Sequence, residues 1–285
     1  MADGAHPATI ALPMPRTTER STLGNLVVMF WTTRLSGVCL VIAVLLLWEA
    51  SVRFGFVKSL NWPAFSAILT ALYTGLVSGE LETAIGSTLW CVLRGYVIGC
   101  SVGVVLGFAI ALWRPIRLTL EPTIEILRTI PATAIIPPLI FVFGLGDPLK
   151  LFAISFAIVF PVTLNTITGV MSVDTTYIQV ARTFGLSRTR ILFRVMFPAT
   201  LPFVMAGLRT SVGLALIVTV VSEMIAGSGG IGYYLLQMQF AMRASEMYAA
   251  TILLAAVAYL LNRIFIAWEA RVIHWARTRE AVWTQ

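Results

Sequence analysis

The sequence is poor in charged residues. They make up 12% of its 285 residues, while 58% are hydrophobic, whereas soluble domains carry about 25% charged residues. This deficit argues against an ordinary soluble domain and indicates that a lipid bilayer surrounds much of the chain. At about 20 residues a span, the length allows roughly five to seven membrane spans and one membrane domain.

Residues and motifs that carry chemistry are scarce as well. Cys39, Cys91 and Cys100 lie inside apolar stretches, so we interpret them as small buried hydrophobic residues and not as disulfide partners or metal ligands. The histidines, His6 and His274, lie near the chain ends. The sequence has no G-x-x-x-x-G-K-[ST] loop for nucleotide phosphates, no His or Cys cluster, no paired carboxylates on one helix face and no G-x-S-x-G elbow. We therefore expect no catalytic residue, no metal and no cofactor bound by this chain, which is not expected to be an enzyme.

The N-terminal stretch MADGAHPATIALPMPRTTER contains prolines and charges but no apolar core followed by a cleavage site. It therefore predicts a cytoplasmic tail, residues 1–34, and not a cleavable signal. Residues 35–270 are predicted to form the transmembrane domain, and residues 271–285 a second cytoplasmic tail.

Apolar runs that end at charges, proline or glycine predict an all-α membrane protein with six transmembrane helices. The predicted spans cover about residues 36–54, 83–113, 124–143, 151–170, 201–225 and 248–268. The glycine-rich run AGSGGIGYY, which follows the fifth span, predicts a tight turn or a re-entrant loop on the outer side.

Prolines interrupt two of these spans: Pro131, Pro137 and Pro138 in the third, and Pro161 in the fourth. Each frees a carbonyl and can kink its helix, and broken backbone at membrane depth is tolerated only where protein or a water-filled cavity receives it. Structural kinks alone are the commoner explanation. The alternative places both spans beside the translocation path, with Thr163, Asn165 and Thr219 as polar lining.

Basic residues are concentrated in alternate connections. The rich set contains Arg16, Arg20, Arg34, Arg114, Arg117, Arg182, Arg188, Arg190, Arg194, Arg271, Arg277 and Arg279. Loops rich in Lys and Arg stay in the cytoplasm, so both termini are predicted to be cytoplasmic, which agrees with an even number of spans. The net charge of +7 is thereby explained by topology, and the expected partner is the lipid bilayer and not nucleic acid.

The polar stretch of residues 172–197 predicts two short helices on the cytoplasmic face. The apolar face of the first helix consists of Tyr177, Val180, Ala181 and Phe184, and that of the second consists of Ile191, Leu192, Val195 and Met196. Asp174 is positioned as the first N-cap, Gly185 as the left-handed residue after the first helix, and Ser187 as the second N-cap. Such an elbow can dock into a groove on a partner or lie on anionic lipid.

This stretch resembles the cytoplasmic EAA loop of ABC importer permeases, in which Glu-Ala-Ala is followed by three residues, a Gly, nine residues and Ile-x-Leu-Pro. The chain reads Gln179-Val180-Ala181, then Gly185, then Val195-Met196-Phe197-Pro198. Every spacing is kept, and Gln179 replaces the leading Glu. The segments IEILRTIPATAIIPPLIFVFGLGDPLKLFAI, FPVTLNTITGVMSVD and VVSEMIAGSGGIGYYLLQMQF look like the permeases of the nitrate, sulfonate and taurine importer group, and the resemblance covers about residues 80–271.

The resemblance implies a type I ABC importer permease in the inner membrane. Such a subunit forms the path for a small, anionic solute (nitrate, a sulfonate, taurine or similar). It implies a second permease copy in a homodimer, two ATPase subunits that use ATP and Mg, and an extracytoplasmic solute-binding protein. The expected ATPase-coupling residues are Gln179, Val180, Ala181, Phe184, Gly185, Leu186, Ser187, Arg188 and Pro198. The alternative is a self-sufficient secondary transporter for a small polar solute, a class that usually has inverted repeats and midplane carboxylates.

Two further patterns concern the interior. Gly95, Gly99, Gly103 and Gly107 form an i, i+4 stripe that lets helices approach closely, and we favour packing within one subunit over a direct subunit interface.

Charges at membrane depth cost about 2.5 to 3.5 kcal/mol on insertion scales. We expect Arg128 and Arg209 to reach the cytoplasmic surface, and we favour an ion pair between Arg94 and Glu223 inside the bundle. The alternative is that Arg94 attracts an anion while Glu223 acts at a gate. The candidate translocation path consists of Arg94, Pro137, Asn165, Thr219 and Glu223.

Overall fold

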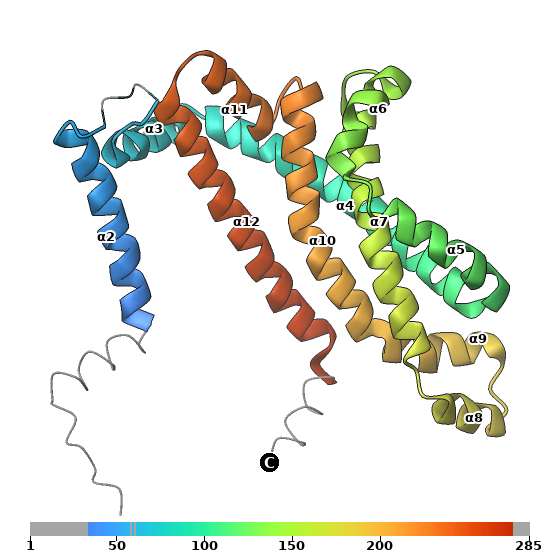
Figure 1. The fold of residues 1–285 in the computed structure, drawn as a ribbon. Coiled ribbons are helices and arrows are strands. Elements are labelled where there is room, and N and C mark those ends of the chain that lie inside the picture. Colours follow the sequence, from blue (N-terminus) through green and yellow to red (C-terminus); the bar gives the residue numbers. More distant parts are fainter. Residues whose placement is uncertain (1–33, 58, 60, 276–285) are drawn as a thin grey trace, which may run out of the picture. The chain divides into compact units, whose positions relative to one another are not determined.

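The computed structural model describes residues 34–57, 59 and 61–275, and the chain divides into two compact units, residues 1–57 and 58–285 (Figure 1). The described part of the first unit contains α2 (Arg34–Arg53), whose 20 residues match the length of a membrane span. Cys39 on this helix is exposed, whereas Cys91 and Cys100 are buried, so the prediction of three buried cysteines is wrong for Cys39. The predicted tails lie almost entirely outside the described residues.

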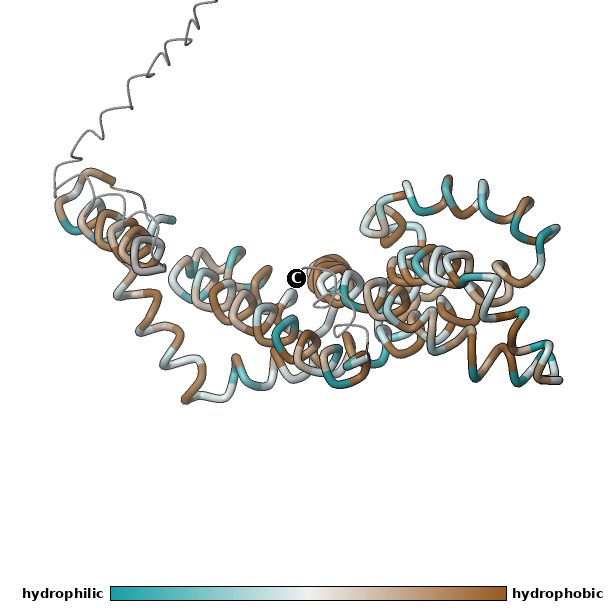
Figure 2. The backbone as a smooth tube through the Cα atoms, turned by 90° about the horizontal axis from the view of Figure 1, so that it is seen from below, coloured by the Kyte–Doolittle hydropathy of each residue, from teal (hydrophilic) through white to brown (hydrophobic). Residues whose placement is uncertain are grey.

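The second unit is a set of helices. Its described part contains, in chain order, α3 (Phe65–Val77), α4 (Glu80–Leu112), α5 (Arg114–Leu127), η1 (Ala132–Ile135), α6 (Ile136–Phe143), α7 (Asp147–Met171), α8 (Thr175–Thr183), α9 (Arg188–Ile191), η2 (Leu192–Met196), α10 (Phe197–Ala226), α11 (Ile231–Phe240) and α12 (Ala244–Val272). No strand occurs in the described ranges, which confirms the all-α class. Hydrophobic residues predominate along these helices (Figure 2).

Four helices among the described residues are long and apolar enough to cross a membrane: α4, α7, the continuous helix Arg188–Ala226, and α12. The bent pair Arg114–Leu127 and Ala132–Phe143 makes a fifth if it is one span. Six spans with both termini in the cytoplasm therefore stay a prediction. The helices α6 and α11 lie at one end of this unit, and α8 and α9 at the other (Figure 1).

The predicted third span, residues 124–143, is broken at Pro131, as its prolines indicated. Its two halves, α5 and the η1–α6 pair, meet at an angle of 83°. Pro131 has no N–H to offer the carbonyl of Leu127 and disfavours a helical conformation at Ile130, so α5 ends before it. Pro137 and Pro138, in contrast, lie in the first turn of α6, where a missing N–H costs nothing.

Other boundaries also differ from the prediction. α7 begins at Asp147 and not at residue 151, because Pro148 suits a first helical turn and the Asp147 carboxylate suits a helix N-terminus. The fifth predicted span begins at Phe197 and is continuous with α9 and η2. The predicted tight turn at the glycine-rich run lies between α10 and α11, but α3 and α11 themselves were not predicted.

α7 packs most extensively against α4 and α10, and glycines make this possible. A Cβ atom on Gly95, Gly103 or Gly107 would lie 2.7, 2.8 or 2.5 Å from side-chain carbons of Ile154, Val162 and Thr166 of α7. The hydroxyls of Ser155 and Thr163 also donate to the carbonyls of Gly95 and Gly103, each at 3.2 Å. The glycine stripe therefore packs within one chain, as favoured from the sequence.

Candidate functional site

The first half of a helical elbow, which we define as residues 172–197, is α8. Its N-cap is Asp174, whose Oδ1 accepts a hydrogen bond from the N–H of Thr176 at 2.8 Å, as predicted. This N–H stabilises the charged carboxylate and holds the pKa of Asp174 below its ordinary value.

A glycine turn ends α8. Gly185 has a φ of 71°, in the left-handed region that favours glycine. The N–H of Gly185 donates to the carbonyl of Arg182 at 2.9 Å, and the N–H of Leu186 donates to the carbonyl of Ala181 at 3.1 Å. These two bonds form a Schellman motif, which uses carbonyls that the helix end leaves free. The predicted role of Gly185 in the backbone is confirmed.

The second half of the elbow differs from the prediction. Ser187 occupies the N-cap position of α9, but its hydroxyl makes no capping hydrogen bond, so the predicted side-chain cap is wrong. α9 is one turn long and passes through the π-helical turn η2 into α10 without a loop. Pro198 cannot donate to the carbonyl of Arg194, and a π-type turn is a usual way to absorb such a break in the helical ladder.

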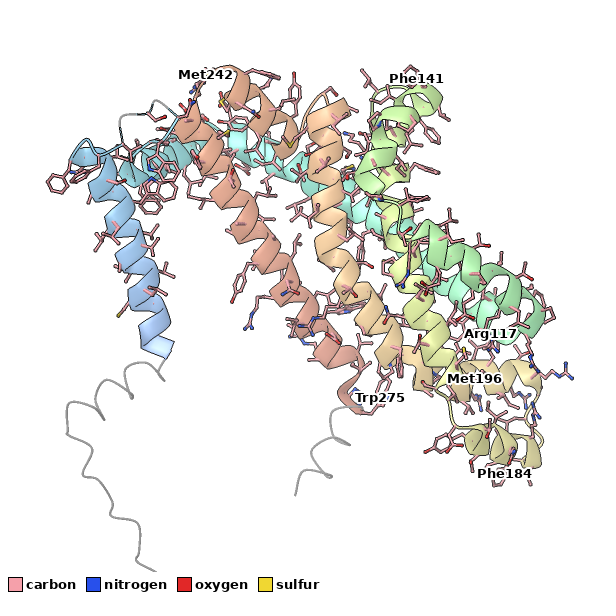
Figure 3. All side chains as sticks on the ribbon, in the orientation of Figure 1. Arg117, Phe141, Phe184, Met196, Met242 and Trp275 are labelled. Carbon is pink, nitrogen blue, oxygen red and sulfur yellow. The ribbon has the colours of Figure 1, made fainter. Side chains whose placement is uncertain are left out.

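The elbow exposes apolar side chains at one end of the unit. Phe184 is 78% exposed, Tyr177 52% and Val180 49%, whereas Ala181 is buried. Figure 3 shows Phe184 at the tip of the elbow. The other expected coupling residues are exposed (Gln179, Gly185, Ser187 and Arg188) or partly buried (Leu186 and Pro198). On the predicted apolar face of α8, Tyr177, Val180 and Phe184 are therefore exposed and Ala181 is buried, whereas on the second predicted face Ile191 is buried and the other residues are partly buried.

A buried polar cluster lies where α4, α10 and α11 meet. The carboxylate oxygens of Glu223 accept hydrogen bonds from the Thr88 hydroxyl, at 3.0 and 2.9 Å, and from the N–H of Gly232 at 3.0 Å. The Thr88 hydroxyl in turn accepts from the N–H of Ile231 at 2.8 Å. Thr88 and Glu223 are both fully buried. The cluster thus fastens the start of α11 to α4 and α10.

Glycines close this cluster around the carboxylate. A Cβ atom on Gly230 would overlap the Glu223 carboxyl group, and one on Gly232 would overlap the Val220 carbonyl. Gly230 also has a positive φ of 98°. The glycine-rich run is therefore shaped to wrap a carboxylate, a role that the sequence analysis did not assign to it.

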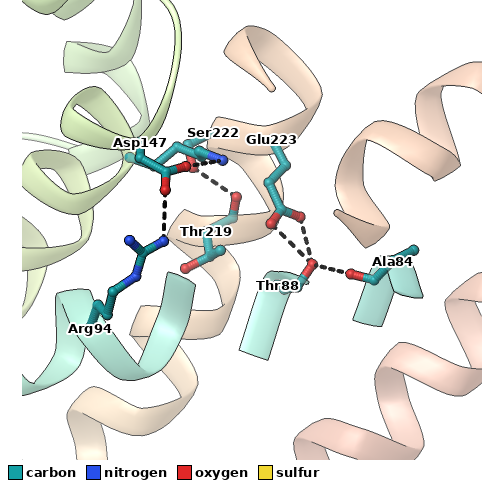
Figure 4. Close-up of polar contacts among 8 residues, drawn as sticks. Ala84, Thr88, Arg94, Asp147, Thr219, Ser222 and Glu223 are labelled. Atoms are coloured by element: carbon teal, nitrogen blue, oxygen red, sulfur yellow. Dashed lines mark hydrogen bonds and ion pairs between the residues drawn. The ribbon is translucent and has the colours of Figure 1, made fainter. Parts of the chain in front are cut away.

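Arg94 does not pair with Glu223, so the favoured ion pair is wrong. Its Nη2 lies 2.7 Å from Oδ2 of Asp147, and the Nζ of Lys150 lies 2.9 Å from Oδ1 of the same carboxylate (Figure 4). Arg94 and Thr88 are six positions apart on α4, about 240° around the helix, so the two residues point in different directions. α7 begins at Asp147, four residues before its predicted start. The Asp147 carboxylate therefore lies beside Arg94 and takes the place predicted for Glu223.

This second cluster carries more positive than negative charge. Arg94 and Lys150 share the single carboxylate of Asp147, and the Lys150 side chain is only 7% exposed. Arg94 also lies over the ring of Trp90, 5.5 Å from its centroid, a favourable cation–π arrangement. The excess of one cation lies at the end of α7 away from the elbow.

The other expected path residues make local contacts. Thr219 is fully buried, and its hydroxyl donates a hydrogen bond to the carbonyl of Ala215. The Thr163 hydroxyl donates to the carbonyl of Gly103 on α4, and the Asn165 side chain donates to the carbonyl of Pro161. Of the prolines, Pro131 and Pro161 line a common cavity at the α5–η1 break, and Pro137 does not line it. A translocation path that includes Pro137, Asn165 and Thr219 therefore stays a prediction.

Known proteins share both this fold and much of this sequence. One chain of a bacterial ABC transporter involved in the import of the acidic polysaccharide alginate superposes with a TM-score of 0.62 at 14% identity, covering 87% of this chain and 93% of that one. An inward-facing MetNI methionine ABC transporter gives a TM-score of 0.59 at 18% identity, covering 67% and 95%. At these identities the likeness concerns the fold alone.

Closer relatives are similar over most of the chain. The putative aliphatic sulfonates transport permease protein SsuC of Escherichia coli (strain K12) is 30% identical over 84% of this chain and 94% of its own length. The bicarbonate transport system permease protein CmpB of Synechococcus elongatus is 28% identical over 85% and 92%. The nitrate import permease protein NrtB of Leptolyngbya laminosa is 30% identical over 74% and 76%.

Residues 103–277 match the family model of the binding-protein-dependent transport system inner membrane component. The match covers the end of α4 from Gly103 onward, all of α7, the elbow and the buried Glu223. With several apolar helices, the chain is a multi-pass protein of the inner membrane. It belongs to the binding-protein-dependent transport system inner membrane component family, as an ABC permease of the nitrate and sulfonate importer group.

Proposed function

We propose that this permease forms the path by which an ATP-driven importer moves a small anionic solute, and that the elbow couples it to a separate ATPase subunit. The observation that carries the proposal is the elbow itself. The apolar side chains of Tyr177, Val180 and Phe184 are exposed on it. The arginines nearby in the elbow are exposed as well: Arg182, Arg188 and Arg190. An apolar helix face with a basic rim suits a groove on a partner protein.

The elbow has a direct connection to the helices that would form the path. Its second half continues without a loop into α10, which packs on α7. Movement of a docked partner would therefore be passed to the membrane helices as a coupling free energy between two distinct sites. Since the chain has no nucleotide-binding loop, ATP and Mg would be used by the partner.

The proposed solute is an anion. The relatives are named for aliphatic sulfonates, bicarbonate and nitrate, all of which are anions. Arg94 adds support, because its guanidinium is one-third exposed and a positive charge at that place attracts anions. In this proposal Arg94 attracts the solute, and Glu223 anchors the glycine-rich turn near the same end.

The proposed assembly contains two copies of this chain, two ATPase subunits and an extracytoplasmic solute-binding protein. Two-fold homodimers are the commonest symmetric assembly. One structure that shares this fold is a bacterial alginate ABC transporter in complex with an alginate pentasaccharide-bound periplasmic protein, and this supports the proposed solute-binding partner.

The test is a pair of substitutions at Gly185. Its φ of 71° is closed to proline, whereas asparagine tolerates the left-handed region. Gly185→Pro should leave membrane insertion intact and abolish both uptake and solute-stimulated ATP hydrolysis in the reconstituted complex, while Gly185→Asn should keep most of both. Normal ATP-dependent uptake by Gly185→Pro would contradict the coupling role.

The alternative function is a self-sufficient secondary transporter. It is tested with proteoliposomes that contain only this chain, under an ion gradient and without ATP. Uptake under these conditions would favour the alternative, and uptake that needs the ATPase and ATP would favour the importer.

A further inference from the structure

A half-open cavity of about 370 Å³ lies at the break between α5 and η1, with the exposed residues Arg128, Thr129, Ile130 and Pro131 on its open side. It is lined by Arg128, Thr129, Ile130, Pro131, Ala132, Phe156, Ala157, Phe160, Pro161, Leu164 and Leu214. These residues come from the break itself, from the middle of α7 and from one position of α10. We call it the helix-break cavity. Small-molecule sites in proteins run from about 300 to 1,000 Å³, so its volume suits an organic molecule better than an ion of a few atoms.

Two prolines account for the polar backbone at this cavity. Pro131 stops α5 and turns the chain, and Pro161 has no N–H for the carbonyl of Ala157, which lines the same cavity. Irregular backbone at membrane depth is tolerated where it is buried in protein or lines a water-filled space. The cavity is therefore where these broken hydrogen-bond ladders can meet water or a solute.

The walls of the cavity are mostly apolar and aromatic. The rings of Phe156 and Phe160 pack edge to face, with centroids 4.9 Å apart, and Leu164 and Leu214 continue the wall. The hydroxyl of Thr129 is occupied, because it donates to the carbonyl of Ile126 at 2.7 Å. A bound molecule would thus place an apolar body against the two rings.

Arg128 is the one charged residue in this lining, and a neighbouring carboxylate holds it in place. Its Nε and Nη2 lie 2.8 and 2.7 Å from the same oxygen, Oε2 of Glu125. This leaves the other N–H donors of the guanidinium to bind an acid group. The paired charges cancel, so a head group with one negative charge is accepted more readily than a doubly charged one.

We propose that the helix-break cavity is a transit site for an organic monoanion, whose acid group meets Arg128 and whose apolar body meets Phe156 and Phe160. The proposal rests on the proposed permease function and deepens it, because it names the class of solute. It distinguishes organic acids from inorganic anions such as nitrate and sulfate.

The test measures binding without transport. The chain, purified with its partner subunits in lipid nanodiscs and without nucleotide, is titrated with alkanesulfonates from methanesulfonate to hexanesulfonate, and with nitrate and sulfate. Calorimetry should show an affinity that rises about fourfold with each added methylene, as burial of about 0.8 kcal/mol each predicts, until the cavity is filled. Empty nanodiscs correct for partition into lipid. Nitrate that binds as tightly as hexanesulfonate would overturn the proposal.

Variants locate the site. Arg128→Gln should weaken binding of every sulfonate about tenfold, whereas Phe160→Leu should flatten the dependence on chain length. Arg117→Gln is the matched control, because it lies on α5 but does not line the cavity. Unchanged binding by both Arg128→Gln and Phe160→Leu would overturn the proposal.

The outcome is separable from that of the coupling proposal. Normal transport by Gly185→Pro, together with the chain-length dependence, would refute coupling and leave the cavity site standing. The predicted loss in Gly185→Pro, together with no chain-length dependence, would refute the cavity site alone.

Discussion

The hydroxyl oxygen of Thr88 lies 3.0 and 2.9 Å from the two carboxylate oxygens of Glu223, across the contact between α4 and α10. Both side chains are fully buried, so this contact is not exchanged for water. The Thr88 hydroxyl also accepts a hydrogen bond from the N–H of Ile231. One hydroxyl on α4 therefore contacts both α10 and α11.

Thr88→Val should destabilise the protein. Valine keeps the shape of threonine but removes the hydrogen bonds to the Glu223 carboxylate and the Ile231 N–H, and an unsatisfied buried polar group costs about 1–3 kcal/mol. Thermal unfolding in detergent should start at a lower temperature than for the wild type. The control is Thr70→Val, since Thr70 is exposed on α3 and its hydroxyl bonds only within its helix. Equal shifts in unfolding temperature for the two variants would show that the Thr88–Glu223 cluster does not stabilise the protein.

Gly103→Leu should prevent tight packing of α4 on α7. The Cβ atom of the new side chain would lie 2.8 Å from the Cβ atom of Val162. Overpacking of this kind typically costs about 1–3 kcal/mol of stability. Less folded protein should survive extraction in mild detergent. Gly86→Leu on the same helix is the matched control, because a Cβ there meets nothing within 4 Å. Similar recovery of both variants would refute the close contact.

Asp174 should make the elbow sensitive to acid. The folded pKa is lowered by the Thr176 N–H, so the N-cap contributes stability above the unfolded pKa of about 3.9 and loses it as the pH falls through the lower folded value. Hydrogen exchange in residues 175–183 should be faster in Asp174→Ala than in the wild type at pH 7. The difference should shrink towards pH 3, and a difference that grows in acid would reverse the sign of the argument.

Asp147→Asn should destabilise the α4–α7 contact. It leaves the buried ammonium of Lys150 and the guanidinium of Arg94 without their shared carboxylate, at a cost of about 1–3 kcal/mol, given that Asp147 is itself half exposed. The double variant Asp147→Asn, Lys150→Met should recover stability in thermal unfolding, because it removes the buried charge as well. Glu246→Gln, in an exposed pair with Arg243, is the control. A double variant less stable than the single one would contradict this account.

Local signals in the sequence predicted the elbow well. Asp174 and Gly185 act through their own neighbours, so their residue types and spacing were enough to predict the cap and the turn. The glycine stripe was equally readable, because a periodic pattern of small residues has few uses in a helix. The four long spans follow from apolar runs alone.

Long-range contacts were not readable from the sequence. The partner of Arg94 could not be chosen without the true start of α7. This helix begins four residues before its predicted start, and its first residue, Asp147, pairs with Arg94 in place of Glu223. The break at Pro131 was readable from the sequence, but its angle of 83° was not. The short helices α3 and α11 lie below the length at which hydropathy predicts a span. The helix-break cavity joins residues of the break between α5 and η1, of α7 and of α10, which no single segment indicates.

The π-helical turn at Leu192–Met196 has a mechanical consequence. Because it lets α9 run on into α10, the helix from Arg188 to Ala226 is one element of 39 residues. It begins in the elbow and carries Glu223 in its last turn, where the glycine-rich bend is anchored. In the proposed importer, a rotation of this helix at the elbow would therefore be transmitted to the glycine-rich bend, because both ends belong to a single piece of secondary structure.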